Sequence, residues 1–124
     1  MIVVAMTAAA LMLPTTVLGH TPSVSLTCQS GLVVNLTAYN SGGSNSVAIS
    51  IDGSAVSGSP FSFGGSYSHT FAVNPPTVGH SATVAVTAWD DPTGSKGWTK
   101  TFNLSIGACQ QPTPAPLAVT VRFV

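Results

Sequence analysis

The segment Leu32-Val-Val-Asn-Leu-Thr-Ala-Tyr39 places an apolar side chain at every second position from Leu32 to Ala38. A period of two residues is typical of a β-strand that has one face towards a core and one towards water. The segment Ser23–Cys28, which precedes it, has the same alternation. We therefore predict two strands at the start of the folded domain.

Five more segments between residues 22 and 107 carry strand signals of this kind: 46–51, 61–63, 67–73, 82–88 and 99–106. Turn residues separate them, and the pair Asp52-Gly53 is favoured in hairpins because both positions tolerate positive φ. No helical period occurs in this range. The pattern predicts an all-β, immunoglobulin-like antiparallel β-sandwich of about seven strands. A small β-barrel is the alternative, because alternation alone does not distinguish the two.

The composition limits the classes of function. Of 124 residues only 5% are charged, with three Lys plus Arg against three Asp plus Glu, and there is no basic cluster. Binding to nucleic acid depends on several clustered cations, so we expect no nucleic acid partner. The chain has no Glu, no nucleophilic triad and no glycine-rich phosphate loop. We therefore expect no enzyme activity.

Composition also divides the chain into three parts. The apolar run 2–18 is broken by Pro14 and is short for a membrane span, so residues 1–19 are expected to form a signal peptide that is cleaved before His20. The folded domain is expected over residues 20–109, and residues 110–124 are expected to be a Pro/Thr-rich linker and short tail. These features predict a secreted or cell-surface protein whose mature chain has no transmembrane span.

The two cysteines lie at the two ends of the predicted domain. Cys28 ends the first strand, and Cys109 follows the last one. In an exported chain such a pair predicts a disulfide. The long loop that it closes would contribute roughly 4 to 5 kcal/mol in the chain-entropy model. The close Cys-x-x-Cys spacing of zinc sites is absent.

The connection between the last two strands has the most distinctive composition in the chain. It contains both tryptophans, two of the acidic residues and one lysine, and its candidate binding residues are Trp89, Asp90, Asp91, Lys96 and Trp98. Strand parity predicts that Trp89 lies on the outer face, partly exposed, and that Trp98 caps the core. An exposed Trp89 could stack on a sugar, although small sandwiches also use tryptophan to plug the end of a core.

Two metal sites are possible alternatives. A mature chain that begins with His20 could bind copper through its α-amino group and imidazole, with His69 or His80 as a further ligand. The competing interpretation places His80 in a polar turn and makes His69 a hydrogen-bonded residue between two aromatic side chains.

Calcium could bind Asp52, Asp90 and Asp91, because it prefers carboxylate and carbonyl oxygens. The competing interpretation is turn chemistry, in which aspartate side chains accept backbone N–H bonds and Gly94 adopts positive φ. Lys96 could also form an exposed ion pair with Asp91.

Two motifs carry a resemblance to a known family. The segment Val84-Ala-Val-Thr-Ala-Trp-Asp-Asp-Pro-Thr-Gly94, followed by Phe102-Asn-Leu-Ser-Ile106, resembles the last hairpin of bacterial immunoglobulin-like surface domains. A closer resemblance, over about residues 20–116, is to secreted or cell-wall-attached actinobacterial proteins that have one such domain before a Pro/Thr-rich stalk. It is carried by His20-Thr-Pro-Ser-Val24, Cys28, Leu36-Thr37 and Trp89-Asp-Asp-Pro-Thr-Gly-Ser-Lys-Gly-Trp98. The resemblance implies a fold and a location, and it assigns no ligand.

Together these features predict a non-catalytic extracellular module for adhesion, recognition or spacing, with a surface protein or glycan as its partner. The alternatives are a copper-binding secreted protein that uses His20 and a carbohydrate-binding module that uses Trp89. No resident cofactor is expected outside the copper and calcium alternatives.

Overall fold

The computed structural model describes residues 19–110, so most of the expected signal peptide and linker lie outside the described residues. The described chain contains eight β-strands and no helix. The strands are β1 (Thr21–Thr27), β2 (Gly31–Thr37), β3 (Asn45–Ile51), β4 (Ser54–Ala55), β5 (Phe61–Phe63), β6 (Tyr67–Phe71), β7 (His80–Thr87) and β8 (Lys100–Ile106). All the strand pairs are antiparallel.

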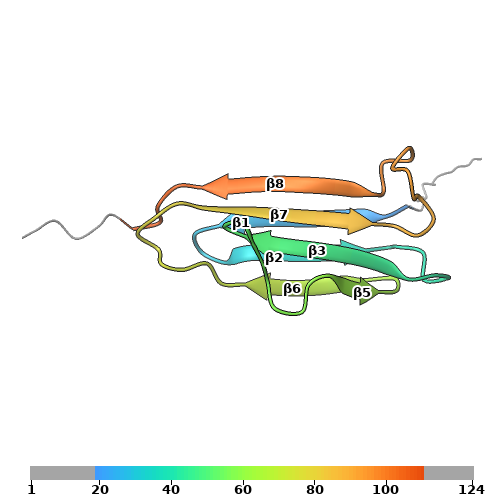
Figure 1. Cartoon of the computed structure of the whole chain (residues 1–124), viewed down its shortest axis with the longest axis horizontal. Coiled ribbons are helices and arrows are strands. Elements are labelled where there is room, and N and C mark those ends of the chain that lie inside the picture. The colour runs from blue at the N-terminus through green and yellow to red at the C-terminus, as the bar shows by residue number, and fades with distance from the viewer. Residues whose placement is uncertain (1–18, 111–124) are drawn as a thin grey trace, which may run out of the picture.

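The strands form two sheets that face each other (Figure 1). One sheet has the order β1-β2-β6, and the other has the order β4-β3-β7-β8, with β5 also paired to β3. In immunoglobulin lettering, β1, β2 and β6 take the places of strands A, B and E, while β3, β7 and β8 take those of C, F and G. The predicted immunoglobulin-like sandwich is confirmed, and the small-barrel alternative is wrong because the sheets do not close on each other.

The core lies between the inner faces of the two sheets. Alternate residues of the central strands are fully buried, namely Leu32, Val34 and Leu36 of β2, Val47 and Ile49 of β3, and Val84 and Val86 of β7. Each such side chain contributes about 1.5 to 3 kcal/mol through burial. In β2, β3 and β7, the residues that the alternating pattern predicted to face the core are therefore the residues that are buried.

The strand that the sequence did not predict is β4. Asp52 and Gly53 have φ values of 52° and 83°, as the hairpin prediction requires, and the chain then pairs back on β3 for two residues. Two residues are too few to show an alternating pattern. The turn was therefore predictable, while the short strand after it was not.

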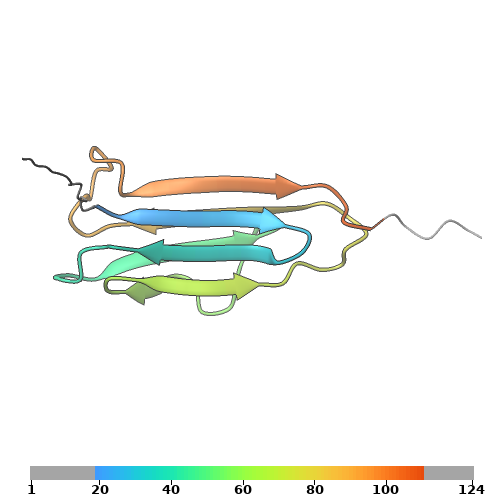
Figure 2. The same cartoon turned by 180° about the vertical axis from the view of Figure 1, so that it is seen from behind.

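The disulfide between Cys28 and Cys109 is confirmed. The two Cα atoms are 5.4 Å apart, across a sequence separation of 81 residues. Cys28 follows β1 and Cys109 follows β8, which lie at adjoining edges of the two sheets (Figure 2). The disulfide thus joins the first strand of one sheet to the last strand of the other.

The sandwich has two ends with different contents (Figure 1). The end that we call the Trp89 end contains His20, the β2–β3 connection and the β7–β8 connection. The opposite end, which we call the disulfide end, contains the disulfide, the β3–β4 turn and the β6–β7 connection. The described chain therefore leaves the domain at Gln110, on the far side from Trp89.

Candidate functional site

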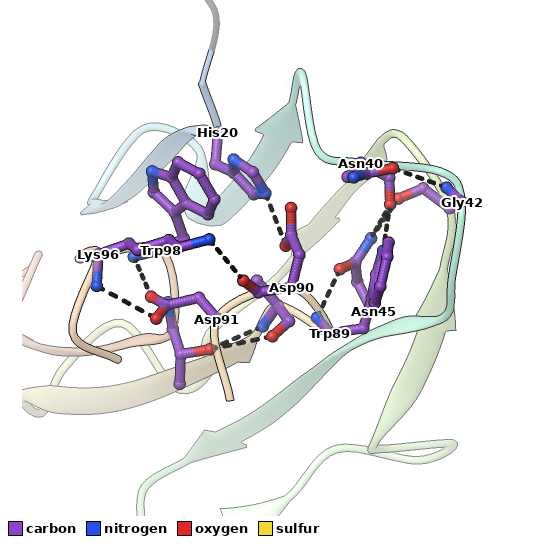
Figure 3. Close-up of polar contacts among 12 residues, drawn as sticks. His20, Asn40, Gly42, Asn45, Trp89, Asp90, Asp91, Lys96 and Trp98 are labelled. Carbon is purple, nitrogen blue, oxygen red and sulfur yellow. Dashed lines mark hydrogen bonds and ion pairs between the residues drawn. The ribbon is translucent and has the colours of Figure 1, made fainter. Parts of the chain in front are cut away.

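The β7–β8 connection is organised by the carboxylate of Asp91 (Figure 3). Its Oδ1 accepts the backbone N–H of Lys96 at 3.1 Å, and its Oδ2 accepts those of Trp98 and Thr99 at 2.9 and 3.1 Å. Gly94 has the positive φ, 78°, that the prediction of turn chemistry required. Asp91 is 1% exposed, so the loop is built around an internal anion.

Opposing effects act on the ionisation of Asp91. Burial alone would raise its pKa, but the backbone N–H bonds from Thr99, Lys96 and Trp98 and the charge of Lys96 outweigh burial and hold the pKa below its ordinary value. The carboxylate is therefore ionised at neutral pH, with both oxygens bound to backbone donors.

The aspartates named for a calcium site are not gathered together. Asp52 lies at the disulfide end, while Asp90 and Asp91 lie at the Trp89 end. Asp90 and Asp91 use their carboxylates for different partners. Residues 19–110 contain no group of three or more His, Cys, Asp or Glu side chains placed to hold a metal ion.

His20 lies in an aromatic cluster at the Trp89 end (Figure 3). Its imidazole stacks on the Trp98 indole with ring centroids 3.9 Å apart, and it meets Tyr39 edge-on at 4.7 Å. Its Nε2 is 3.1 Å from Oδ1 of Asp90. The Trp98 side chain packs against the core, as predicted, and burial raises the pKa of Tyr39 to about 12.

The other two histidines lie elsewhere. His80 is the first residue of β7 and is buried, so its expected place in a polar turn is wrong. Its Nδ1 is 2.6 Å from Asp52, and its Nε2 is 2.7 Å from the Pro75 carbonyl oxygen. His69 is exposed on β6, with its ring 4.5 Å from that of Phe71. The structure therefore does not bring His80 to His20, as one form of the copper site would need.

Trp89 is exposed and held in place. It is 43% exposed, which confirms the parity prediction, and its Nε1 donates a hydrogen bond to the Asn40 carbonyl at 2.8 Å. The indole lies against Gly43 so closely that a Cβ there would come within 2.6 to 2.8 Å of three ring atoms. The side chain thus rests on the β2–β3 connection in a fixed orientation.

Asn45 links the β2–β3 connection to the β7–β8 connection. It was not among the site residues predicted from the sequence. It is fully buried, its Nδ2 donates to the carbonyls of Asn40 and Gly64, and its Oδ1 accepts the backbone N–H of Trp89 at 3.1 Å. A signal was present, because Asn45 has the same parity as the buried Val47 of β3. A polar residue at an inward position implies an internal hydrogen-bond network.

Lys96 has a different role from the one expected. Its backbone N–H binds Asp91, while its Nζ donates to the Asp90 carbonyl at 3.2 Å and lies 4.9 Å from the centre of the Trp98 ring. Within residues 19–110 the acid–base side-chain pairs are His20–Asp90 and His80–Asp52. The expected side-chain ion pair with Asp91 is therefore wrong, and Lys96 covers Trp98 instead.

No protein-family model, curated protein or solved structure matches this chain. Residues 19–110 contain no helix that is long and apolar enough to cross a membrane. They also enclose no pocket. The candidate site is the surface at the Trp89 end, defined by the exposed Trp89 indole and the residues of the β2–β3 connection that lie against it, Asn40, Gly42 and Gly43.

Proposed function

We propose that this protein is a non-catalytic, extracellular immunoglobulin-like module that recognises a ligand on a cell or wall surface through the Trp89 end. The observation that carries the proposal is the orientation of the exposed Trp89 indole, which Asn40 and Gly43 fix from one side while Asn45 fixes its backbone. A tryptophan side chain supplies a large, rigid contact area at low cost in conformational entropy.

Rigid presentation favours binding. Association costs conformational entropy for each side chain that becomes immobilised, about 0.5 to 1.5 kcal/mol. Trp89 loses little conformational entropy on binding, because its Nε1–H already donates a hydrogen bond to the Asn40 carbonyl. Tryptophan is also the residue type most enriched among those that dominate binding energy at interfaces.

Extracellular display is supported by the disulfide and by the placement of the two ends. Disulfides persist in oxidising compartments. Gln110, which begins the expected linker, lies at the disulfide end, so a stalk that starts there would hold the Trp89 end outward (Figure 2). Cleavage before His20 would leave the new amino terminus at the Trp89 end.

A neutral glycan is the first ligand class to test, ahead of a surface protein. The β2–β3 connection, on which the Trp89 indole rests, contains no charged residue. Its exposed polar side chains are those of Asn40, Ser41 and Ser44. The nearest charged side chains have partners, because Asp90 pairs with His20 and Lys96 covers Trp98. Sugars are bound by aromatic rings that cover their apolar faces, together with neutral groups that bind their hydroxyls.

The test is binding of the purified protein to peptidoglycan sacculi, to an array of neutral oligosaccharides and to whole bacterial cells. Trp89→Ala should weaken binding at least about tenfold, the loss expected for a central aromatic contact. Val78→Ala is the matched control, since Val78 is the other large exposed hydrophobic residue among residues 19–110 and lies at the disulfide end. Equal binding by Trp89→Ala and the unsubstituted protein would rule out this surface. Binding that occurs only to whole cells, and that is lost after the cells are treated with protease, would identify a protein ligand.

A further inference from the structure

Three polar or charged residues of the described chain are buried: Asn45, His80 and Asp91. Two of them build the Trp89 end, but His80 lies at the disulfide end, in contact with neither the indole nor its loop. The His80 side chain is 2% exposed, and both of its ring nitrogens have close partners. A buried polar network that the proposed binding surface does not use calls for an explanation of its own.

The partners of His80 determine its protonation state. Nδ1 faces a carboxylate oxygen of Asp52 at 2.6 Å, and Nε2 faces the carbonyl oxygen of Pro75 at 2.7 Å. Both partners accept hydrogen bonds, whereas a neutral imidazole has only one N–H to donate. Both bonds form only when the ring is the doubly protonated imidazolium.

The network joins three parts of the disulfide end. Besides binding His80, Asp52 accepts the backbone N–H of Ser81 at 2.9 Å through its other oxygen. The β6–β7 connection is held through Pro75, and the next carbonyl, that of Pro76, accepts the backbone N–H groups of Cys109 and Gln110 at 2.8 and 2.9 Å. His80 thus links the β3–β4 turn to the connection on which the end of the domain rests.

We propose that His80 is a proton-operated latch, which ties the β6–β7 connection to the β3–β4 turn at the disulfide end and releases this connection when the ring loses its second proton. The neutral ring keeps a single N–H, which stays on Nδ1 because its bond to the charged Asp52 carboxylate is the stronger one, so the bond from Nε2 to Pro75 is lost. The β6–β7 connection, residues 72–79, contains no strand. Once the bond to Pro75 is lost, the connection and the bonds that Pro76 accepts from Cys109 and Gln110 open while the core stays folded.

Few groups compete with Asp52 for this role. The element paired with the start of β7 is β8, which places Ile106 opposite His80, and the β6–β7 connection contributes only a carbonyl. Asp52 is therefore the charged group that faces the imidazole among the described residues. The hydrogen bond that His80 donates to Asp52, followed by the one to Pro75, raises the pKa of His80 above its ordinary value against the effect of burial. The latch is therefore closed at pH values below the ordinary histidine pKa and opens as the pH rises through the raised pKa.

The test uses the folded protein with ¹⁵N-labelled histidine. At pH 6 the long-range ¹H–¹⁵N spectrum should show both His80 nitrogens protonated. As the pH rises through this titration, the hydrogen-exchange protection factors of the Cys109 and Gln110 amides should fall about tenfold, while those of the β7 core amides change little. A neutral His80 ring at pH 6, or protection of Cys109 and Gln110 that does not follow the titration, would overturn the proposal.

Two variants separate the latch from a general effect of pH. Asp52→Asn keeps an oxygen for the Ser81 N–H but removes the charge, so the His80 titration and the loss of protection should move together to lower pH. Asp90→Asn alters the other His–Asp pair, at the Trp89 end, and should leave both midpoints at the disulfide end unchanged. If Asp52→Asn fails to fold, the titration of the unsubstituted protein still decides the question. If the His80 titration and the loss of amide protection have different midpoints in Asp52→Asn, the latch is contradicted.

Discussion

The His20 imidazole lies parallel to the Trp98 indole, with an interplanar angle of 11° and ring centroids 3.9 Å apart. This contact joins the first described residues of the chain to the last turn before β8. It forms a single cluster with Tyr39, which meets His20 edge-on. The Trp89 end is therefore closed by aromatic packing in addition to the hydrogen bonds of Asp91.

Replacing His20 tests this packing. His20→Ala should destabilise the domain by about 0.5 to 1.5 kcal/mol, the value of one aromatic pair beyond its buried area, and should shift Trp98 fluorescence to the red as water reaches the ring. His20→Phe keeps the stack but loses the bond to Asp90, so it should retain most of the stability. Urea unfolding followed by fluorescence measures both effects. If His20→Ala unfolds at the same urea concentration as the unsubstituted protein, the stack contributes nothing to stability.

The Asp91 carboxylate should be the most sensitive polar group at the Trp89 end. Asp91→Ala leaves three backbone N–H groups without their acceptor, so the midpoint of thermal unfolding should fall on the order of 10 °C. Asp90→Ala is the neighbouring control and removes only the contact with His20. Circular dichroism on heating compares the two. Equal losses in both variants would show that Asp91 does not organise the loop.

Gly43 tests whether the orientation of Trp89 matters. In Gly43→Ala the new Cβ would lie 2.6 to 2.8 Å from three atoms of the indole, so the ring must move away from residue 43 and lose its present orientation. We expect a cost of about 1 to 3 kcal/mol, together with lost binding to the ligand that Trp89 recognises. Gly64→Ala is the control at the same end, because a Cβ there meets nothing closer than 3.7 Å. Unchanged binding by Gly43→Ala would show that ligand recognition does not depend on the fixed orientation of Trp89.

The sequence predicted the parts of the fold that depend on alternation and missed those that depend on tertiary contacts. The parity of β2 gave its buried face, and the parities of Trp89 and Trp98 gave one exposed and one core-facing indole. His80 was misplaced because strand β7 was predicted to begin at Ala82. Alternation extended back by two residues puts His80 on the inward face, beside Ala82.

The partners of the site residues were beyond reach of sequence patterns. Trp89 binds Asn40, 49 positions away, and His20 binds Asp90, 70 positions away. Such pairs follow from strand order and from the connections that meet at one end, neither of which the alternation specifies. The turn chemistry of Asp91 was predictable because its partners lie within eight residues.

The disulfide should contribute a large share of the stability. Replacing Cys28 and Cys109 together with serine opens a loop of 81 residues, which the chain-entropy model values at about 4 to 5 kcal/mol. Urea unfolding of the double variant should show that loss, while the antiparallel sheet signal in circular dichroism remains at low urea. If the free energy of unfolding falls by less than about 1 kcal/mol, the disulfide does not contribute a large share of the stability. Val33→Ser, at a partly exposed position of β2, is a control for a polar change in the same sheet.

The pair of His80 and Asp52 predicts the pH dependence of stability. The raised pKa of His80 means that its contribution is complete below the ordinary histidine value, about 6.5, and is lost as pH rises through the folded-state pKa. The pKa of Asp52 is lowered by its bonds to His80 and Ser81, so its contribution is complete above the ordinary aspartate value, about 3.9, and is lost as pH falls through the folded-state pKa. Urea midpoints should therefore be highest between about pH 4 and 6.5 and decline on both sides. In His80→Phe the alkaline decline should disappear, and its persistence there would assign it to another group.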